Sequence, residues 1–389
     1  MLTFTYCMCL FSACSLFQKQ EPKLDYPPIW EYDFNVGLFS SIDPILYKDK
    51  VIYSGLDEKK NDFSANSTLE AFDKKNGKPI WVWDEGNEQD AGQFNPSRGN
   101  YVSENILHIS TGVDYAINLN DGSTIDYYAE PKVGGQDFSG YNDVIISDFY
   151  NDQLTNPTLS YTNTKNFNWK VVSSYFSSDT LLLGFSQPVF KNNEMIIPLM
   201  EWNPIKKILR MYLEKYNLTN MTLYSKMLFS DNIFDSSPDY PPLLINDCIY
   251  ISLGGKIAAV GINNAQIVWV QNVKYNASRS GIMYADGQIL VNTEFQLYAL
   301  DAETGAINWQ IDSSAGGRMQ HHKGVVYYNS GTTLRGVDMA NGEILLDIEA
   351  PSRTNNSNAF FQGAITIDKE NDRIYTASYT HAYCYPTLR

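Results

Sequence analysis

Charged residues are scarce in this chain of 389 residues, of which they make up only 19%, and no cluster of Lys and Arg occurs. A nucleic-acid-binding protein needs a basic footprint to neutralise phosphates, and this chain has a formal net charge of −15 instead. The 43% of hydrophobic residues supply enough apolar mass for a large core. We therefore predict a globular protein that does not bind nucleic acid, rather than a disordered chain or a coiled coil.

Cysteine and histidine are also scarce, which limits disulfide and metal chemistry. Three of the five cysteines lie in the first 14 residues, and only Cys248 and Cys384 lie in the rest of the chain, without a disulfide framework or a CxxC zinc pattern. His321 and His322 are adjacent, and neighbouring side chains on a strand point to opposite faces. Because GxSxG, HExxH and phosphate-binding glycine motifs are missing as well, we expect no metal, no cofactor and no catalytic residue.

The N-terminus has features of an export signal. Residues 2–13 form an apolar stretch that is too short to span a bilayer, and it ends in the sequence LFSAC. Small residues before a cysteine resemble a bacterial lipobox, although Phe11 stands where Leu is usual and no basic segment leads the stretch. We predict a lipoprotein-type signal peptide at 1–13, lipidation of Cys14 and a polar tether at 14–27. A plain cleaved signal or an uncleaved apolar N-terminus is the alternative.

One phrase recurs along the chain at a regular spacing. It reads Ala-x-Asp-x-x-x-Gly-x-x-x-Trp from Ala71 to Trp81 and again from Ala299 to Trp309, and weaker copies return every 37 to 55 residues. Such a period marks a repeat architecture. We expect the Trp to pack between neighbouring units, and the Asp and Gly to hold the turn before it. The residues that receive this structural role are Trp30, Asp73, Gly77, Trp81, Trp169, Trp269, Asp301, Gly305 and Trp309.

The strands around each copy of the phrase predict a propeller. Each unit holds four short runs rich in Val, Ile and Tyr and separated by Gly, Asn and Asp, which is typical of a propeller blade. Residues 28–33 look like a fourth strand without a unit before it, whereas the last unit lacks its fourth strand. If the N-terminal strand completes the C-terminal blade, no long sheet edge stays open. We predict an all-β, eight-bladed propeller of four-stranded antiparallel blades as one domain at 28–389; because two units are degenerate, seven blades is the alternative.

The phrase from Ala299 to Trp309 resembles the repeat of the pyrroloquinoline-quinone (PQQ)-like propeller superfamily. That group includes quinone-dependent alcohol dehydrogenases and a non-enzymatic lipoprotein of the outer-membrane β-barrel assembly machine. The enzymes resemble one another in a vicinal Cys-Cys disulfide beside the cofactor, a calcium ion and a catalytic Asp, and the body of this chain has no adjacent cysteines. The resemblance therefore implies the assembly-factor branch, a non-catalytic envelope lipoprotein that is monomeric and binds protein partners through the loops of one face.

Two other functions stay open at this point. One is a glycan-binding or glycan-processing surface lipoprotein, and the other, in last place, is a quinone-dependent dehydrogenase. For either lipoprotein, we expect the bacterial cell envelope as the location, on the periplasmic side of the outer membrane or at the surface, with the lipid as the only membrane anchor.

Residues that do not repeat are the candidates for binding. The first strand of each blade lines the central channel, so residues at its entry form a ring. Three arginines in this ring would suit an acidic protein partner or a glycan; the alternative is that the side chains only bond channel carbonyls and water. By register, this candidate ring comprises Asp43, Arg98, Gln187, Arg279, Arg318 and Gln362.

Overall fold

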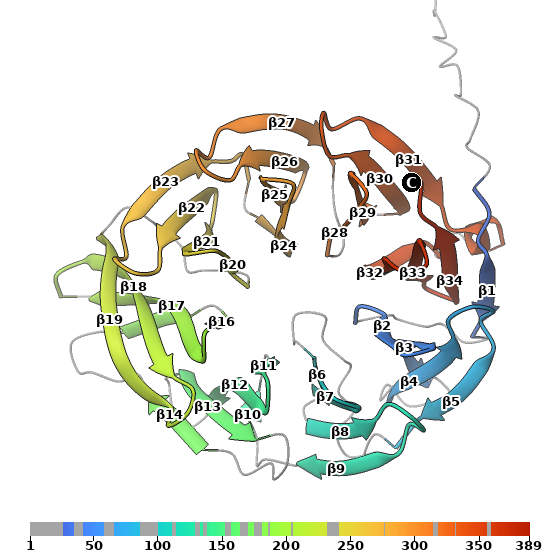
Figure 1. Cartoon of the computed structure of the whole chain (residues 1–389), viewed down its shortest axis with the longest axis horizontal. Helices are drawn as coiled ribbons and strands as arrows, with labels where there is room; N and C mark the ends of the chain where they lie inside the picture. Colours follow the sequence, from blue (N-terminus) through green and yellow to red (C-terminus); the bar gives the residue numbers. More distant parts are fainter. Residues whose placement is uncertain are drawn as a thin grey trace, which may run out of the picture.

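The computed structural model shows a ring of small sheets around a central axis (Figure 1). The helical content among the described residues is one 3-10 turn, η1 (Pro351–Thr354). No helix in the described part of the chain is long and apolar enough to cross a membrane. The residues that the structure describes are 26–34, 42–57, 66–85, 100–110, 114–128, 133–134, 138–151, 157–163, 170–174, 181–185, 187–203, 205–231, 241–275, 277–313, 318–330, 332–355 and 359–389.

The described strands form eight antiparallel sheets, which confirms the predicted eight-bladed propeller. In each blade the first strand lies nearest the axis and the fourth forms the outer rim (Figure 1). Blade 1 contains β2 (Ile45–Tyr47), β3 (Lys50–Asp57), β4 (Asn66–Asp73) and β5 (Pro79–Trp83), and blade 2 contains β6 (Tyr101–Ser103), β7 (Ile106–Ser110), β8 (Asp114–Asn118) and β9 (Thr124–Tyr128). Blade 5 contains β20 (Leu243–Ile245), β21 (Cys248–Leu253), β22 (Lys256–Gly261) and β23 (Ile267–Asn272). Blade 6 contains β24 (Ala277–Ala285), β25 (Gln288–Thr293), β26 (Gln296–Asp301) and β27 (Ile307–Asp312), and blade 7 contains β28 (Gln320–His322), β29 (Val325–Ser330), β30 (Thr333–Asp338) and β31 (Ile344–Glu349).

Blades 3 and 4 depart from the regular pattern because their inner strand is divided into two pieces that pair with one long second strand. Blade 3 contains β10 (Val133–Gly134), β11 (Phe138–Tyr141), β12 (Val144–Asn151), β13 (Pro157–Asn163) and β14 (Lys170–Ser174). Blade 4 contains β15 (Leu181–Phe185), β16 (Val189–Lys191), β17 (Glu194–Asn203), β18 (Ile208–Asn217) and β19 (Thr222–Asp231). The second and third strands of blade 4, β17 and β18, are ten residues long and pair from Glu194–Asn217 to Asn203–Ile208.

The N-terminal strand closes the ring, as predicted. Blade 8 combines β32 (Phe361–Asp368), β33 (Arg373–Ser378) and β34 (His381–Pro386) with β1 (Trp30–Asp33) as its outer strand. Trp30 pairs with Cys384 and Asp33 with His381 in an antiparallel register. The two ends of the chain therefore share one sheet, and no blade of the described ring is left with three strands.

The recurring phrase forms the hairpin between the third and fourth strands of a blade. In blade 1 the carboxylate of Asp73 accepts hydrogen bonds from the backbone N–H groups of Lys75 and Asn76, and the N–H of Gly77 donates to the Asp73 carbonyl. Gly77 has a φ of 71°, which costs little for glycine but strains other residues. Ala71 then pairs directly with Trp81 after a bulge, and the same pairing joins Ala299 to Trp309 in blade 6.

Four tryptophans of the repeat, Trp30, Trp81, Trp269 and Trp309, pack on the glycine of the next blade, and Trp169 lies outside the described residues. A Cβ atom added to Gly77 of blade 1 would lie 2.6 Å from the Trp30 ring of blade 8, and one added to Gly305 of blade 6 would lie 2.6 Å from the Trp269 ring of blade 5. The indole N–H of Trp269 also donates to the carbonyl of Ala302, beside that glycine, at 3.0 Å. The hairpin turn of one blade therefore packs against the indole ring of the preceding blade.

The hydrophobic core lies between the blades. Every cluster that the described residues form combines buried side chains from two neighbouring blades. One joins Trp30 and Tyr375 of blade 8 to Tyr53 and Phe72 of blade 1, so the closing strand takes part in the core and not only in the sheet. Because no blade buries its faces alone, the ring depends on contacts with nearest neighbours, as in other repeat proteins.

Candidate functional site

The candidate ring falls at the inner ends of the blades, as far as the structure describes it. Asp43 precedes β2, Arg318 precedes β28, and the half-buried Gln187 precedes β16 on the opposite side of the ring (Figure 1). Arg279 lies in β24 and Gln362 in β32, but their side chains are outside the described part of the structure, as is the whole of Arg98. Whether the six side chains form one binding ring stays a prediction.

Two members of the candidate ring meet at the inner ends of the blades. The guanidinium of Arg318, from blade 7, lies 3.7 Å from the carboxylate of Asp43, from blade 1. Blade 8 lies between them in the ring, so the pair bridges the inner edge of the blade where the chain closes. Burial raises the pKa of Asp43, and the charge of Arg318 opposes this shift.

Neighbouring groups hold the Asp43 backbone in place. The N–H of Ile42 donates to the hydroxyl of Ser54 on β3, and the hydroxyl of Thr366 on β32 donates to the carbonyl of Pro44. These bonds anchor both residues next to Asp43, one to its own blade and one to blade 8. Arg318, by contrast, has a side chain that is 48% exposed.

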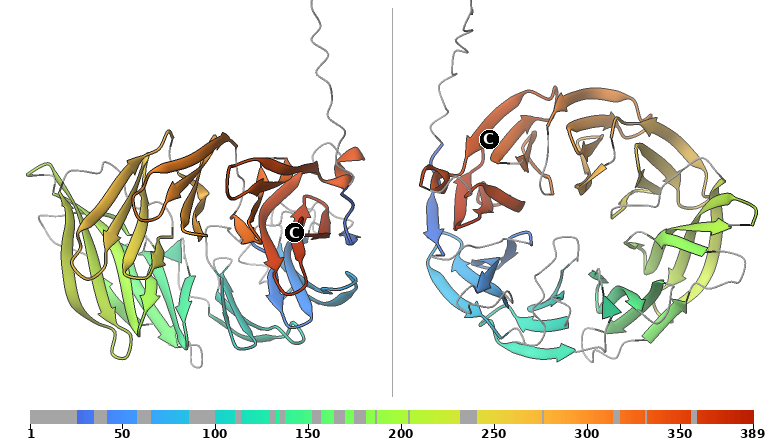
Figure 2. Two further views of the ribbon diagram at one scale, coloured as in Figure 1. Left: turned by 45° about the horizontal axis from the view of Figure 1, so that its top comes forward. Right: turned by 180° about the vertical axis from the view of Figure 1, so that it is seen from behind.

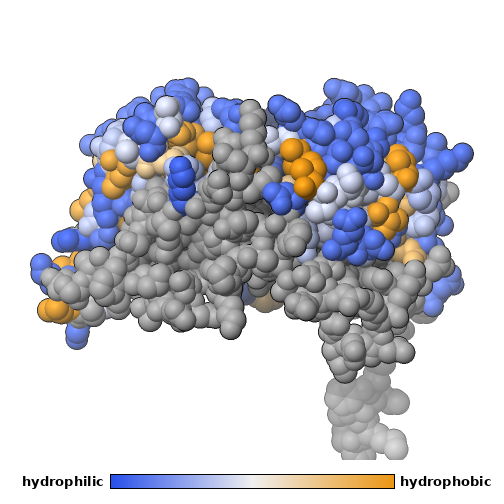
Figure 3. All heavy atoms as spheres, turned by 90° about the horizontal axis from the view of Figure 1, so that it is seen from below, coloured by the Kyte–Doolittle hydropathy of each residue, from blue (hydrophilic) through white to orange (hydrophobic). Residues whose placement is uncertain are grey.

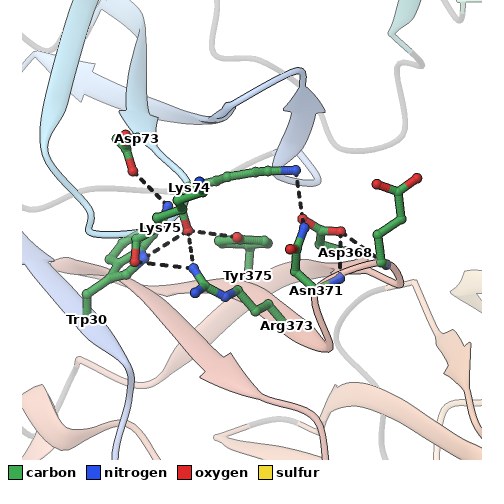
Figure 4. A network of polar contacts seen from close by, with 9 residues as sticks. Trp30, Asp73, Lys74, Lys75, Asp368, Asn371, Arg373 and Tyr375 are labelled. Atoms are coloured by element: carbon green, nitrogen blue, oxygen red, sulfur yellow. Dashed lines mark hydrogen bonds and ion pairs between the residues drawn. The ribbon is translucent and has the colours of Figure 1, made fainter.

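A second polar cluster, which the sequence did not predict, lies where blade 8 meets the hairpin between β4 and β5 of blade 1 (Figure 4). The carbonyl of Lys74 in blade 1 accepts hydrogen bonds from three blade 8 side chains: Trp30, Arg373 and Tyr375. The ammonium of Lys74 lies 2.9 Å from the carboxylate of Asp368. Burial alone would raise the pKa of Asp368, but hydrogen bonds from Lys74 and Asn371 outweigh it, so the pKa is lowered.

The two adjacent histidines point to different neighbours, as expected for successive strand residues. His322 lies 2.6 Å from Asp372 of blade 8, and His321 lies 3.1 Å from Asp286 of blade 6. Burial lowers the pKa of His321, against the effect of Asp286. The pair therefore links three successive blades, and within the described ranges no group of three or more His, Cys, Asp or Glu residues could hold a metal.

A groove of about 790 Å³ lies at the rim between β31 of blade 7 and the closing strand β1. Its walls include Tyr26, Ile29 and Glu31 from the start of the chain, and Ile348 and Pro351 from the end of blade 7. It is a feature of the outer rim and is separate from the candidate ring in the channel.

The comparisons with known proteins agree with this architecture. Residues 253–384 match the family model for the outer membrane protein assembly factor BamB, whereas a search of the curated proteins finds no match. The crystal structure of BamB from Moraxella catarrhalis is similar to this chain with a TM-score of 0.64 and 10% identity, over 93% of this chain and 98% of its own. Sqt1 from Chaetomium thermophilum has a TM-score of 0.61 and 12% identity, over 93% and 99%. A europium-containing methanol dehydrogenase has a TM-score of 0.62 and 9% identity, over 90% and 84%.

The repeat, the closed ring and the similar structures define an eight-bladed propeller, and the family match supports the resemblance to the PQQ-like repeat over residues 253–384. Both BamB and a dehydrogenase share this fold, so fold alone does not decide the activity. The residues fit a quinone site poorly. Cys248 on β21 and Cys384 on β34 are free and lie in different blades, so they cannot supply the adjacent pair that the enzymes have in common.

Proposed function

We propose that this protein is a non-catalytic, lipid-anchored scaffold of the bacterial cell envelope that binds protein partners. The observation that carries the proposal is the match of residues 253–384 to the family model of the assembly factor BamB. The similarity in fold to BamB from Moraxella catarrhalis supports it, since it extends over 93% of this chain and 98% of that one. In this proposal Cys14 carries the lipid and residues 14–27 form the tether.

The mouth of the channel is the proposed contact for a partner. Arg318 is half exposed, and its 3.7 Å separation from Asp43 leaves hydrogen-bonding capacity unused, because a guanidinium carries five N–H donors. A carboxylate of a partner protein can therefore bind Arg318 in a bidentate manner. The anchored backbone around Asp43 gives such a partner a fixed place to dock.

Affinity purification of the full-length chain from its native envelope tests the scaffold role. We expect one or more protein partners to be recovered reproducibly, and Arg318→Ala to reduce their recovery. Arg353→Ala is the matched control, because Arg353 is also a partly exposed arginine in an ion pair, with Glu349 at 3.2 Å, but lies in η1 away from the channel. The absence of any reproducible partner would contradict the proposal, and equal losses for both variants would remove the channel mouth as the contact.

The anchor is tested separately. Cys14→Ser should leave the fold intact and move the protein from the membrane fraction to the soluble fraction of the envelope, because a cysteine thiol is the only acylation point in the proposal. Metabolic labelling with a fatty acid should mark the unaltered chain and not the variant. Labelling of both proteins, or of neither, would show that Cys14 is not lipidated.

A further inference from the structure

A long hairpin projects from blade 4. Its strands β17 and β18 are ten residues long, as is β19, whereas the second and third strands of the next three blades have six. In Figures 1 and 2 this light-green hairpin reaches beyond the circle of the outer strands. We call its distal described part, residues 199–203 and 205–212, the blade 4 finger, and the described residues of its turn, 203 and 205–208, the finger tip.

The finger tip presents an apolar side chain to solvent. Ile205 is 76% exposed, whereas the next most exposed large hydrophobic residue described, Val268, is 59% exposed. The N–H of Lys206 donates to the Asn203 side chain at 2.8 Å, which fixes the turn. Below the tip, Trp202 packs against the core between blades 4 and 5. The paired strands therefore carry Ile205 at their end, where its side chain stays largely exposed.

Two lysines flank this side chain. Lys206 and Lys207 are exposed, and neither has an ion-pair partner among the described residues. Lys226, lower on the same blade, is different because it pairs with Glu201 and with Glu214 at 3.3 Å. The tip thus joins an exposed apolar group to two uncompensated positive charges, in a chain whose net charge is −15.

We propose that the finger tip is a membrane contact that inserts Ile205 into the interface of an anionic bilayer while Lys206 and Lys207 bind lipid phosphates. An apolar group bordered by cations is the pattern of interfacial membrane binding. A turn of six residues is too small for a stable protein interface, which buries at least about 1,200 Å². On the face drawn in Figure 3, the hydrophobic residues that are coloured form small separate groups among hydrophilic ones.

The negative charge of the rest of the chain explains why a projecting element is needed. An anionic surface repels the acidic ring, but at physiological salt this repulsion is screened beyond about 8 Å. A finger that extends past the outer strands lets the two lysines reach the headgroups while the ring stays at a distance. This contact goes beyond the proposed scaffold role and needs no protein partner, so the two proposals can fail independently.

Vesicle co-sedimentation tests the proposal without the lipid anchor. The protein used is the chain from residue 15 onward, which retains every described strand, including β1. We expect it to bind vesicles of phosphatidylglycerol and phosphatidylcholine, to bind pure phosphatidylcholine far more weakly, and to dissociate as salt rises. Ile205→Ser should lower the partition coefficient roughly tenfold, and the double variant Lys206→Gln/Lys207→Gln roughly thirtyfold on the anionic vesicles.

Matched controls separate the finger from general surface effects. Val268→Ser removes a comparably exposed apolar side chain from β23, and Lys75→Gln/Lys78→Gln removes two exposed lysines from the blade 1 hairpin. Both should bind vesicles as the unaltered chain does, and circular dichroism should show that all variants are folded. No binding to anionic vesicles, or equal losses in the finger and control variants, would overturn the proposal.

Discussion

The contact between a tryptophan and the glycine of the next blade can be measured by adding a single methyl group. In Gly305→Ala the new Cβ would lie 2.6 Å from two carbons of the Trp269 ring, whereas ordinary contacts begin near 3.4 Å. The substitution also places a side chain at a φ of 74°, which costs about 1–2 kcal/mol. Forcing the ring and the turn apart adds about 1–3 kcal/mol. We therefore expect a loss of about 2–5 kcal/mol in the free energy of unfolding, as the sum of these two costs.

Gly287→Ala supplies the control for this experiment. Gly287 has nearly the same backbone, with a φ of 78°, but a Cβ there would meet no atom within 4 Å. It should lose only the backbone part, about 1–2 kcal/mol. Urea unfolding followed by tryptophan fluorescence measures both variants, and Trp269→Leu should shrink the difference between them because the clashing ring is gone. Equal losses for the two alanine variants would refute the view that the hairpin turn of one blade packs against the tryptophan of the preceding blade.

Three further predictions concern the closure and the buried charges. Trp30→Ala should cost about 3–5 kcal/mol in a thermal or urea unfolding experiment, because its ring joins the core between blades 8 and 1; a loss below 1 kcal/mol would mean that β1 contributes little to closure. The pKa of Asp368 is lower in the folded protein than in the unfolded chain, so this group stabilises the fold above its unfolded pKa, and the stabilisation is lost as the pH falls through the folded value. Asp368→Asn should therefore reduce the free energy of unfolding at pH 7 and make it depend less on acid pH. The exposed control Glu303→Gln should change neither. Burial lowers the pKa of His108 to about 4, so the imidazole takes up a proton in the unfolded chain at a higher pH than in the folded protein. The free energy of unfolding should therefore fall by about 3 kcal/mol between pH 6.5 and 4. Urea titrations should show a smaller fall in His108→Phe, and an unchanged fall would contradict the lowered pKa of His108.

The sequence predicted the eight blades and the strand that closes them more completely than it predicted the side-chain contacts between blades. The spacing from Asp to Gly to Trp is local, so the hairpin around Asp301 could be recognised from eleven residues. The displaced strand at Trp30 could be recognised as well, because the last unit visibly lacked a fourth strand. The partner of each Trp is a different matter, since Trp269 packs on Gly305 of the following blade. That contact depends on how far successive blades rotate about the axis, which no local spacing contains.

The candidate ring shows the same limit. Asp43 and Arg318 are far apart in sequence and two blades apart in the ring, yet they lie 3.7 Å from each other. Predicting that distance requires the inward reach of the segments before β2 and β28, which depends on the hydrogen bonds that hold Ile42 and Pro44. The divided inner strands of blades 3 and 4 were missed for a related reason, because pieces as short as Val133–Gly134 carry no periodic signal.

The closure also imposes an order of events when the protein is made. Tyr26 donates to the carbonyl of Pro386 across 360 positions of sequence, and β1 pairs only with β34 in the same region. Translation produces β1 first and its partner only after all the other blades, so the first strand must stay unpaired throughout synthesis. Contacts of such sequence separation form slowly, and an exported chain would therefore complete its ring only after translocation has released the C-terminal blade. During this interval β1 is an open strand, and this is the stage at which a chaperone would have most to protect.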